Sequence, residues 1–419
     1  MYKITYSICF HSFRFFKKVA LRCGEIQKEG QCYITYFPGI IFSRCKGLEY
    51  RRLVWLNNAE FQKIKNCLPD SYFNAWGPKF LFNSQPNQSH EILPAIWLYH
   101  FKNAYVVANS SHIVTDEFAF IERVSSINSA LANYSTGHVF DHSDNYAIVR
   151  KIQHYEIENA VFLGGNGSEN YYHWLIEILP KLQFFIEEGI LSHSRSTLLI
   201  NSRVQEIPSF QTLLDQALKD QNVQITYMDD EYSYKVKNLY HLSTPNNIVF
   251  NTRNQISSPA NNFIRKESLD YVRDLGFSLN SNYKSGAEGP KRIFLARRNS
   301  LRSYNQAEIF KLLEKYGFKE VYLETLSVQK QVQLFRNAEF IVGPTGAAWS
   351  NLIFCQKQPK CLCWMAEQIG DFSAFANLAK YSGADLNYIT YKAESLNIYR
   401  SDYVLDKNLL LQALIKLAV

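Results

Sequence analysis

Residues 340–354 read FIVGPTGAAWSNLIF, and this stretch decides the class of fold. Three apolar residues typical of a buried strand run into a turn with two glycines, and the apolar run after the turn has the length of a short helix. A strand, a glycine turn and a helix in that order predict an α/β layer. Ligands gather outside the carboxyl ends of strands in an open parallel sheet, so the residues after 342 are candidates for a binding site.

The same alternation of strand and helix extends in both directions from this stretch. Upstream of about residue 155, by contrast, short β-type runs such as 32–37, 104–108 and 146–152 stand between polar turns, without an interpretable motif. Further strands are expected at 161–163, 197–200, 223–228, 292–296, 318–323 and 361–365, with helices at about 171–188, 210–218, 263–275, 306–316 and 327–337, the last capped by Ser327.

The length of the chain predicts two lobes, since 419 residues exceed a usual single domain. The first lobe is expected over residues 1–245, with its β-rich part ending near 155, and the second over 246–395, after a change to polar sequence. A helix is expected within 396–419, with a return onto the first lobe as one option for its packing.

Composition excludes several classes of protein. Hydrophobic residues make up 47% and charged residues 20%, which excludes a disordered chain. The net charge of +7 includes no run of like charges typical of a nucleic-acid arm, so small anions are the expected ligands and nucleic acid is not. The eight cysteines lack zinc spacing, and we interpret them as reduced thiols of a cytosolic protein.

The basic, Phe-rich stretch at 10–22 is broken by Arg14, Lys17, Lys18 and Arg22, unlike the core of a signal peptide. No stretch approaches the roughly 20 apolar residues that span a bilayer. Two interpretations of 10–22 stay open: an element packed on the first lobe, or an amphipathic contact with an anionic membrane surface.

Three predicted strand ends have complementary chemistry. Arg297, Arg298 and Arg302 follow the first strand of the second lobe, and guanidinium groups bind phosphate oxygens in pairs. Residues 343–348, GPTGAA, let a ligand approach the backbone at the start of a helix. Glu367 follows a later strand, where a carboxylate could bind ribose hydroxyls. Together they indicate a site for a nucleotide diphosphate, although each alone is also common in salt bridges and turns.

A different pair stands in the first lobe. His173 and Glu177 are four residues apart on the helix predicted at 171–188, so their side chains share one face. Either could act as the base for an acceptor hydroxyl. A histidine that only hydrogen-bonds a neighbouring carboxylate is the alternative.

These residues resemble glycosyltransferase family 61, particularly its bacterial members linked to capsular polysaccharide biosynthesis. Residues 171–182, YYHWLIEILPKL, are similar to the family's Y-H-W-L-x-E/D-x-L-P-R-L pattern. The likeness continues through 292–302, then through 331–338, QVQLFRNA, and through 343–354 to Glu367. Three residues depart from the pattern. Many relatives have histidine at the position of Thr345, the family has a second glycine at the position of Ala348, and it has arginine at the position of Lys181.

The resemblance implies a GT-B-like α/β fold of two Rossmann-type lobes facing a cleft. It implies an inverting hexosyl- or pentosyltransferase with a nucleotide-sugar donor, commonly a UDP-sugar, in the second lobe. The acceptor would be a glycan or lipid-linked glycan, bound at the first lobe. The protein would act in the cytoplasm, with peripheral contact to the inner face of the membrane as an option. Glu177 and His173 are the catalytic candidates, and the donor-binding candidates are Arg297, Arg298, Arg302, Thr345, Gly346, Ala347, Asn351 and Glu367.

No cofactor is expected, and the lack of any D-x-D predicts transfer without a metal, because cationic side chains could stabilise the leaving group. A non-catalytic nucleotide- or sugar-binding protein on the same fold is the alternative. Another α/β enzyme, such as an epimerase or a dehydrogenase, is less favoured because residues 164–167, GGNG, lack the G-x-G-x-x-G spacing.

Overall fold

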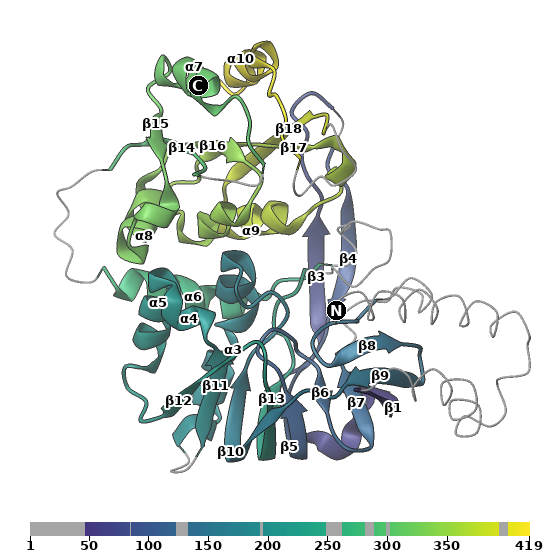
Figure 1. Cartoon of the computed structure of the whole chain (residues 1–419). Helices are drawn as coiled ribbons and strands as arrows, with labels where there is room; N and C mark the ends of the chain where they lie inside the picture. Colours follow the sequence, from purple (N-terminus) through teal and green to yellow (C-terminus); the bar gives the residue numbers. More distant parts are fainter. Residues whose placement is uncertain are drawn as a thin grey trace, which may run out of the picture.

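The computed structural model describes residues 47–83, 85–122, 133–192, 196–248, 262–280, 289–298, 302–393 and 401–419. The β-type run expected at 32–37 and the basic stretch at 10–22 lie outside the described residues. The described chain is mixed α/β, with one large sheet in the lower part of Figure 1, a smaller sheet in the upper part, and helices between them.

The large sheet has eleven strands in the order β12-β11-β10-β13-β5-β6-β7-β1-β9-β8, with β2 paired to β5. Its strands are β1 (Leu48–Trp55), β2 (Lys63–Leu68), β5 (Ile96–Val106), β6 (Ile113–Val114), β7 (Phe118–Ile121), β8 (Val139–His142), β9 (Tyr146–Arg150), β10 (His154–Leu163), β11 (Thr197–Asn201), β12 (Gln224–Met228) and β13 (Ser233–Leu242).

The direction of strand pairing in this sheet changes at β13. The strands β10, β11 and β12 pair in parallel, as predicted for an α/β layer, and β13 also runs parallel to β10. On its other side β13 pairs antiparallel with β5, and the following pairs are antiparallel except β1 with β7. The sheet is therefore mixed, unlike the parallel sheet of a simple Rossmann-type unit.

The second sheet is parallel throughout, in the order β15-β14-β16-β17-β18. Numbered along the chain, this order is 2-1-3-4-5, which is a doubly wound arrangement whose direction of winding reverses between β14 and β16. The strands are β14 (Arg292–Leu295), β15 (Lys319–Val321), β16 (Phe340–Pro344), β17 (Lys360–Ala366) and β18 (Asp385–Tyr391).

Helices lie at the predicted positions, with two differences in geometry, and two further helices, Arg203–Glu206 and Ala374–Ser382, were not predicted. The helix predicted at 171–188 is a π-helix, η3 (His173–Ile178), followed after a turn by α3 (Lys181–Glu187), and the apolar run after β16 is a 3₁₀ helix, η7 (Ala347–Phe354). The cap predicted at Ser327 is confirmed, because its side chain accepts a hydrogen bond from the Lys330 N–H. The other α-helices are α4 (Arg203–Glu206), α5 (Pro208–Leu218), α6 (Lys266–Ser278), α7 (Gln306–Glu314), α8 (Val328–Asn337), α9 (Ala374–Ser382) and α10 (Lys407–Lys416). Short 3₁₀ turns are η1 (Leu56–Asn58), η2 (Glu60–Gln62), η4 (Ile190–Ser192), η6 (Leu323–Thr325) and η8 (Glu367–Ile369).

The two sheets share a core. One continuous apolar cluster contains Leu163 and Trp174 of the first part together with Phe294 and Trp364 of the second. The strand pair β3 (Ser71–Trp76) and β4 (Gln88–Leu93) rises from the large sheet toward the smaller one (Figure 1), where the Trp76 N–H donates to Asn377 Oδ1 at 2.8 Å. The parts are therefore held together by apolar packing and by a β-ribbon.

The helix expected near the C-terminus, α10, lies beside α7. Lys407 forms an ion pair with Glu308 of α7 at 2.6 Å, and Lys360 Nζ donates to the Leu417 carbonyl at 2.9 Å. Lys416 at the end of the helix lies over the ring of Phe82, 5.0 Å from its centroid. Its contacts are thus mainly with the second sheet, and Phe82 adds one from the N-terminal half of the chain.

Candidate functional site

Two predicted features meet where the winding of the parallel sheet reverses. Arg297 comes two residues after β14, and Thr345 and Gly346 come directly after the neighbouring strand β16. The Arg297 guanidinium donates a hydrogen bond from Nη2 to the Thr345 carbonyl. A crevice for ligands is expected at such a reversal, so a fixed positive charge lies beside the strand ends where ligands bind.

The position of Arg297 is fixed on both sides. Its backbone N–H donates to Gln306 Oε1 at 2.9 Å, and Gln306 Nε2 donates back to the Arg297 carbonyl at 3.2 Å. Gly346 leaves room for the guanidinium, because a Cβ there would lie only 3.0 Å from Arg297 Nη2. A larger residue at 346 would displace the arginine, so the glycine serves the arrangement of charge as well as the turn.

The other predicted donor residues fall into different places. Arg302 lies on the side of β17 and β18. Burial raises the pKa of Tyr391 and the pKa of Tyr403 on this side, and the positive charges of Arg302 and Arg297 oppose this rise. Arg298 is exposed and lies over the ring of Tyr322, 5.4 Å from its centroid, next to β15. The structure therefore gathers Arg297 and Arg302, while Arg298 is directed to the far edge.

The remaining donor candidates surround the helix η7 and the end of β17. Ala347 begins η7 and is partly exposed, and Glu367 is exposed at the start of η8. Asn351 is fully buried, and its amide donates to the Ala348 carbonyl at 3.2 Å. Asn351 thus faces the interior, and Ala347 and Glu367 remain at the surface near the strand ends.

The predicted pair on η3 is in contact. His173 Nδ1 lies 2.5 Å from Glu177 Oε2, and Glu177 Oε1 accepts the backbone N–H of Ile248 at 2.6 Å. Burial alone would lower the pKa of His173, but the charge and the hydrogen bond of Glu177 outweigh it and raise this pKa above its ordinary value. The side chains of both residues are mostly buried, with 13% and 9% exposed, so the pair is pre-organised.

A glycine and an asparagine place this pair. Gly167 has φ +69°, and a Cβ there would lie 2.6 Å from Cδ2 of His173, so the imidazole packs directly on the glycine backbone. Asn170 Oδ1 accepts the Tyr172 N–H at 2.9 Å at the start of the helical segment. The GGNG turn has the wrong spacing for a dinucleotide site. Its last glycine instead provides the backbone surface on which the histidine ring packs.

Tyr171 connects the two predicted clusters. Its hydroxyl donates to Asn351 Oδ1 at 3.0 Å, across 180 residues of sequence, and the ring of the next residue, Tyr172, lies 5.9 Å from that of Phe375 on α9. The two residues that precede the π-helix therefore contact η7, the segment that follows the Gly346 turn, and α9. This hydrogen bond links the segment before the base candidates to the helix that follows the Gly346 turn.

Sequence reasoning missed a buried charge beside the pair. Lys181 is 1% exposed, and burial lowers its pKa although Glu122 and Glu177 oppose this effect. Burial also raises the pKa of Glu122, a change that Lys181 counteracts. The signal in the sequence is a lysine in the otherwise apolar run 178–182, ILPKL, after Glu177, which favours a paired internal cation over a solvated one.

Two other features, a membrane-spanning helix and a cluster of metal-binding side chains, are absent from the described residues. No helix among them is long and apolar enough to cross a membrane. No group of three or more histidine, cysteine, aspartate or glutamate side chains in this part of the chain could hold a metal ion.

Comparison with protein families gives a match for the central part of the chain. The model of the family described as Glycosyltransferase 61 matches residues 171–362, which begin at Tyr171 and end in β17. The matched range contains the His173–Glu177 pair, Arg297 and the Gly346 turn. No curated protein matches the chain.

Proposed function

We propose that the chain transfers a sugar from a nucleotide-sugar, first of all a UDP-sugar, to a glycan acceptor, because the model of glycosyltransferase family 61 matches residues 171–362. The family indicates glycosyltransferase activity, with a donor and an acceptor as substrates. We further propose that the reaction inverts the anomeric carbon and that the transferred group is a hexose or a pentose. The product would be part of capsule or another cell-surface polysaccharide.

We propose a GT-B-like arrangement for this reaction, with the donor on the parallel sheet and the acceptor on the side of η3. The doubly wound order of the second sheet and the parallel edge β10 to β12 of the first support it. The substrates would meet between η3 and the β14 and β16 strand ends. Tyr171, two residues before η3, bonds Asn351 of η7, the helix that follows β16.

One observation supports the donor site most strongly: the Arg297 guanidinium lies at the Thr345 carbonyl where the winding of the sheet reverses. Arg297 and Arg302 would hold the diphosphate, with the backbone at Gly346 and Ala347 beside it. As the bond between the anomeric carbon and the diphosphate oxygen breaks, these cations would stabilise the negative charge that develops on the leaving group.

Glu177 is the proposed base. It would accept the proton of the acceptor hydroxyl while that oxygen attacks the anomeric carbon from the face opposite the diphosphate, and the nucleoside diphosphate would leave with the bonding electron pair. His173 would orient the Glu177 carboxylate through the 2.5 Å contact. The acceptor is a glycan or a lipid-linked glycan, and we place the reaction in the cytoplasm near the membrane face.

The donor site is tested by a thermal-shift panel of UDP, GDP, CDP, CMP and their sugar conjugates. One nucleotide is expected to raise the melting temperature, because a ligand at 100 times its Kd stabilises the native state by about 2.7 kcal/mol. The variant Arg297→Ala should lose most of this shift, because the guanidinium at the strand ends is removed.

Arg336→Ala is the matched control. Arg336 is exposed, and its guanidinium donates to Gln356 at 2.7 Å, at the end of α8. It should keep the full shift. Equal shifts in both variants would place the nucleotide elsewhere, and binding without any transferred sugar would identify a binding protein on this fold.

Transfer is expected to proceed without a divalent ion. Arg297 and Arg302 would provide the positive charge that a metal provides in other transferases. Full turnover in EDTA, measured with the nucleotide-sugar found in the panel, is the expected result. Loss of activity in EDTA followed by recovery with Mn²⁺ would contradict this mechanism.

A further inference from the structure

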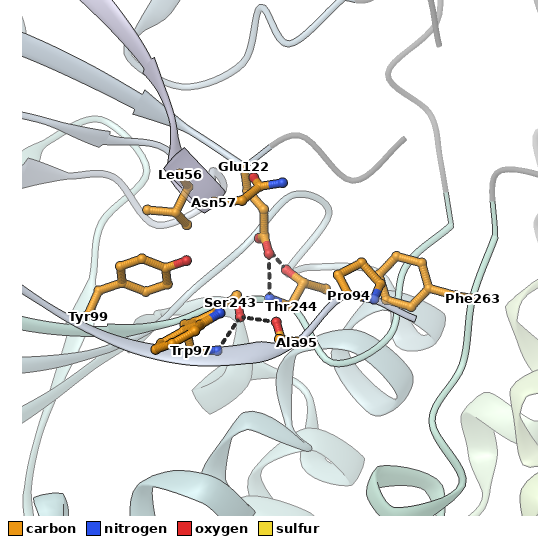
Figure 2. Close-up of a pocket in the computed structure, with 10 residues that line it drawn as sticks. All are labelled: Leu56, Asn57, Pro94, Ala95, Trp97, Tyr99, Glu122, Ser243, Thr244 and Phe263. Carbon is orange, nitrogen blue, oxygen red and sulfur yellow. Dashed lines mark hydrogen bonds between the residues drawn. The ribbon is translucent and has the colours of Figure 1, made fainter. Parts of the chain in front are cut away.

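A cavity opens beside the large sheet, where Ser243 and Thr244 follow the end of β13. Its volume is about 230 Å³, below the roughly 300–1,000 Å³ of sites for drug-sized ligands, so it suits a single small ring. Figure 2 shows residues from several segments converging on it: Leu56, Asn57, Pro94, Ala95, Trp97, Tyr99, Glu122, Ser243, Thr244 and Phe263.

The polar groups of this cavity are already oriented. Both oxygens of Glu122 accept hydrogen bonds from Thr244, one from its N–H and one from its hydroxyl, each at 2.7 Å (Figure 2). Ser243 Oγ accepts the Trp97 N–H at 2.9 Å. A carboxylate oxygen has a second acceptor position, so Glu122 can still receive hydrogen bonds from the hydroxyls of a ligand.

Aromatic side chains form much of the wall. Trp97 and Tyr99 lie on β5, and Phe263 contributes a ring from another segment, beside Pro94 (Figure 2). Pockets for small molecules commonly combine such apolar surface with a few fixed polar groups. Aromatic rings beside a hydroxyl-binding carboxylate are suited to a sugar, whose ring presents C–H groups on its faces and hydroxyls at its edge.

The charge of the lining restricts the kind of sugar. The ten lining residues contain one carboxylate, Glu122, and no lysine, arginine or histidine. Lys63, which lies 4.6 Å from the centroid of the Trp97 ring, is itself paired with Glu60 at 2.6 Å. The cation that acts on Glu122, Lys181, is 1% exposed and does not line the cavity. A carboxylate or phosphate on the ligand would therefore meet Glu122 without a cation in the lining to pair with, so the lining favours an uncharged ring.

A short segment joins this cavity to the proposed base. Thr244 holds Glu122, Asn246 Nδ2 donates to the Ile176 carbonyl at 2.6 Å, and Ile248 donates to Glu177 at 2.6 Å. The stretch 244–248 therefore lies against the cavity at one end and against η3 at the other. A ligand in the cavity would be next to the place where an acceptor loses its proton.

We propose that this cavity binds an uncharged sugar residue of the acceptor glycan, adjacent to the residue that receives the transferred sugar. The inference rests on the proposed transferase function, because it assigns the acceptor to this side. The sugar's hydroxyls bind Glu122, and its ring lies against Trp97 and Tyr99.

The test follows the tryptophan indole N–H signals of the ¹⁵N-labelled full chain by NMR during titration with methyl glycosides. Trp97→Phe identifies the Trp97 signal. Trp76→Phe is the matched control, since the Trp76 ring also lies under a lysine, with Lys380 Nζ 4.2 Å from its centroid, but on β3 outside the cavity. Neutral hexosides should shift the Trp97 signal saturably, and methyl glucuronide should bind roughly tenfold more weakly or worse.

The outcomes separate this inference from the proposed function. An unmoved Trp97 signal in a chain that binds its nucleotide would overturn the cavity assignment and leave the transferase standing. Equal affinity for the glucuronide would overturn the restriction to uncharged sugars. Trp97→Phe should raise the acceptor KM with little change in the donor KM, whereas Trp76→Phe should change neither, and an unchanged acceptor KM would contradict the acceptor role.

Discussion

Glu177→Gln is expected to lower the rate of sugar transfer by roughly 10²-fold to 10⁴-fold, the usual cost of removing a general base. The amide keeps the shape of the side chain and an oxygen that can accept the Ile248 N–H, now at 2.6 Å from Glu177, but it cannot accept a proton from the acceptor. Turnover at saturating donor and acceptor measures the effect, and the donor-induced thermal shift should be unchanged.

The same substitution should change the pH dependence of stability. Glu177 raises the pKa of His173, so the pair stabilises the fold fully below the ordinary histidine pKa of about 6.5 and loses this contribution as pH rises through the raised value. In Glu177→Gln this dependence should disappear. If Glu177→Gln and His173→Ala both keep near-normal turnover, the base lies elsewhere.

Lys181→Met is expected to cost roughly 3–5 kcal/mol of unfolding free energy, as removal of one partner from a buried charge network does. Lys181 is 1% exposed, and its charge acts on Glu122 and Glu177. Methionine fills a similar volume, so the loss would come mainly from the buried carboxylate of Glu122 left without its cation, since Glu177 keeps His173. The midpoint of urea unfolding measures it.

Lys237→Met is the control for this substitution. Lys237 pairs with Glu158 at 2.6 Å, but 62% and 64% of the two side chains are exposed, and such surface pairs contribute little. The control should be almost neutral. Similar losses in both variants would show that the buried position of Lys181 has no special energetic weight.

Four of the five strands of the second sheet could be predicted because they and the helices between them are local patterns, whereas β18 and the helix α9 before it were not predicted. The strand at 340–342, its glycine turn and the Ser327 cap were all read from neighbouring residues, and the structure has β16, the turn and the cap in those places. The proximity of Arg297 to Thr345 followed from one rule, that strand ends of a parallel sheet meet at one edge.

Contacts between distant segments could not be predicted. The helix expected at 171–188 contains a π-helix and a turn, since its residues pack on partners far along the chain: Tyr171 bonds Asn351, and the Trp174 ring stacks on Phe210 at 5.3 Å. The antiparallel pairing of β13 with β5 joins strands more than 100 residues apart. The Glu122 cavity has the same origin, because no single stretch of sequence contains its wall.

The β3 and β4 ribbon has a consequence for the order in which the chain acquires its structure during synthesis. Trp76 donates to Asn377 and Lys79 pairs with Asp385, partners 301 and 306 residues later in the chain. At ribosomal rates of roughly 5–20 residues per second, the ribbon waits about 15–60 s before its partners are made. During that interval the ribbon has two unpaired strand edges and lacks its C-terminal partners. Its Tyr72 and Ile92 side chains are 70% and 63% exposed even in the finished fold. We therefore expect a chaperone to bind the nascent chain at this ribbon.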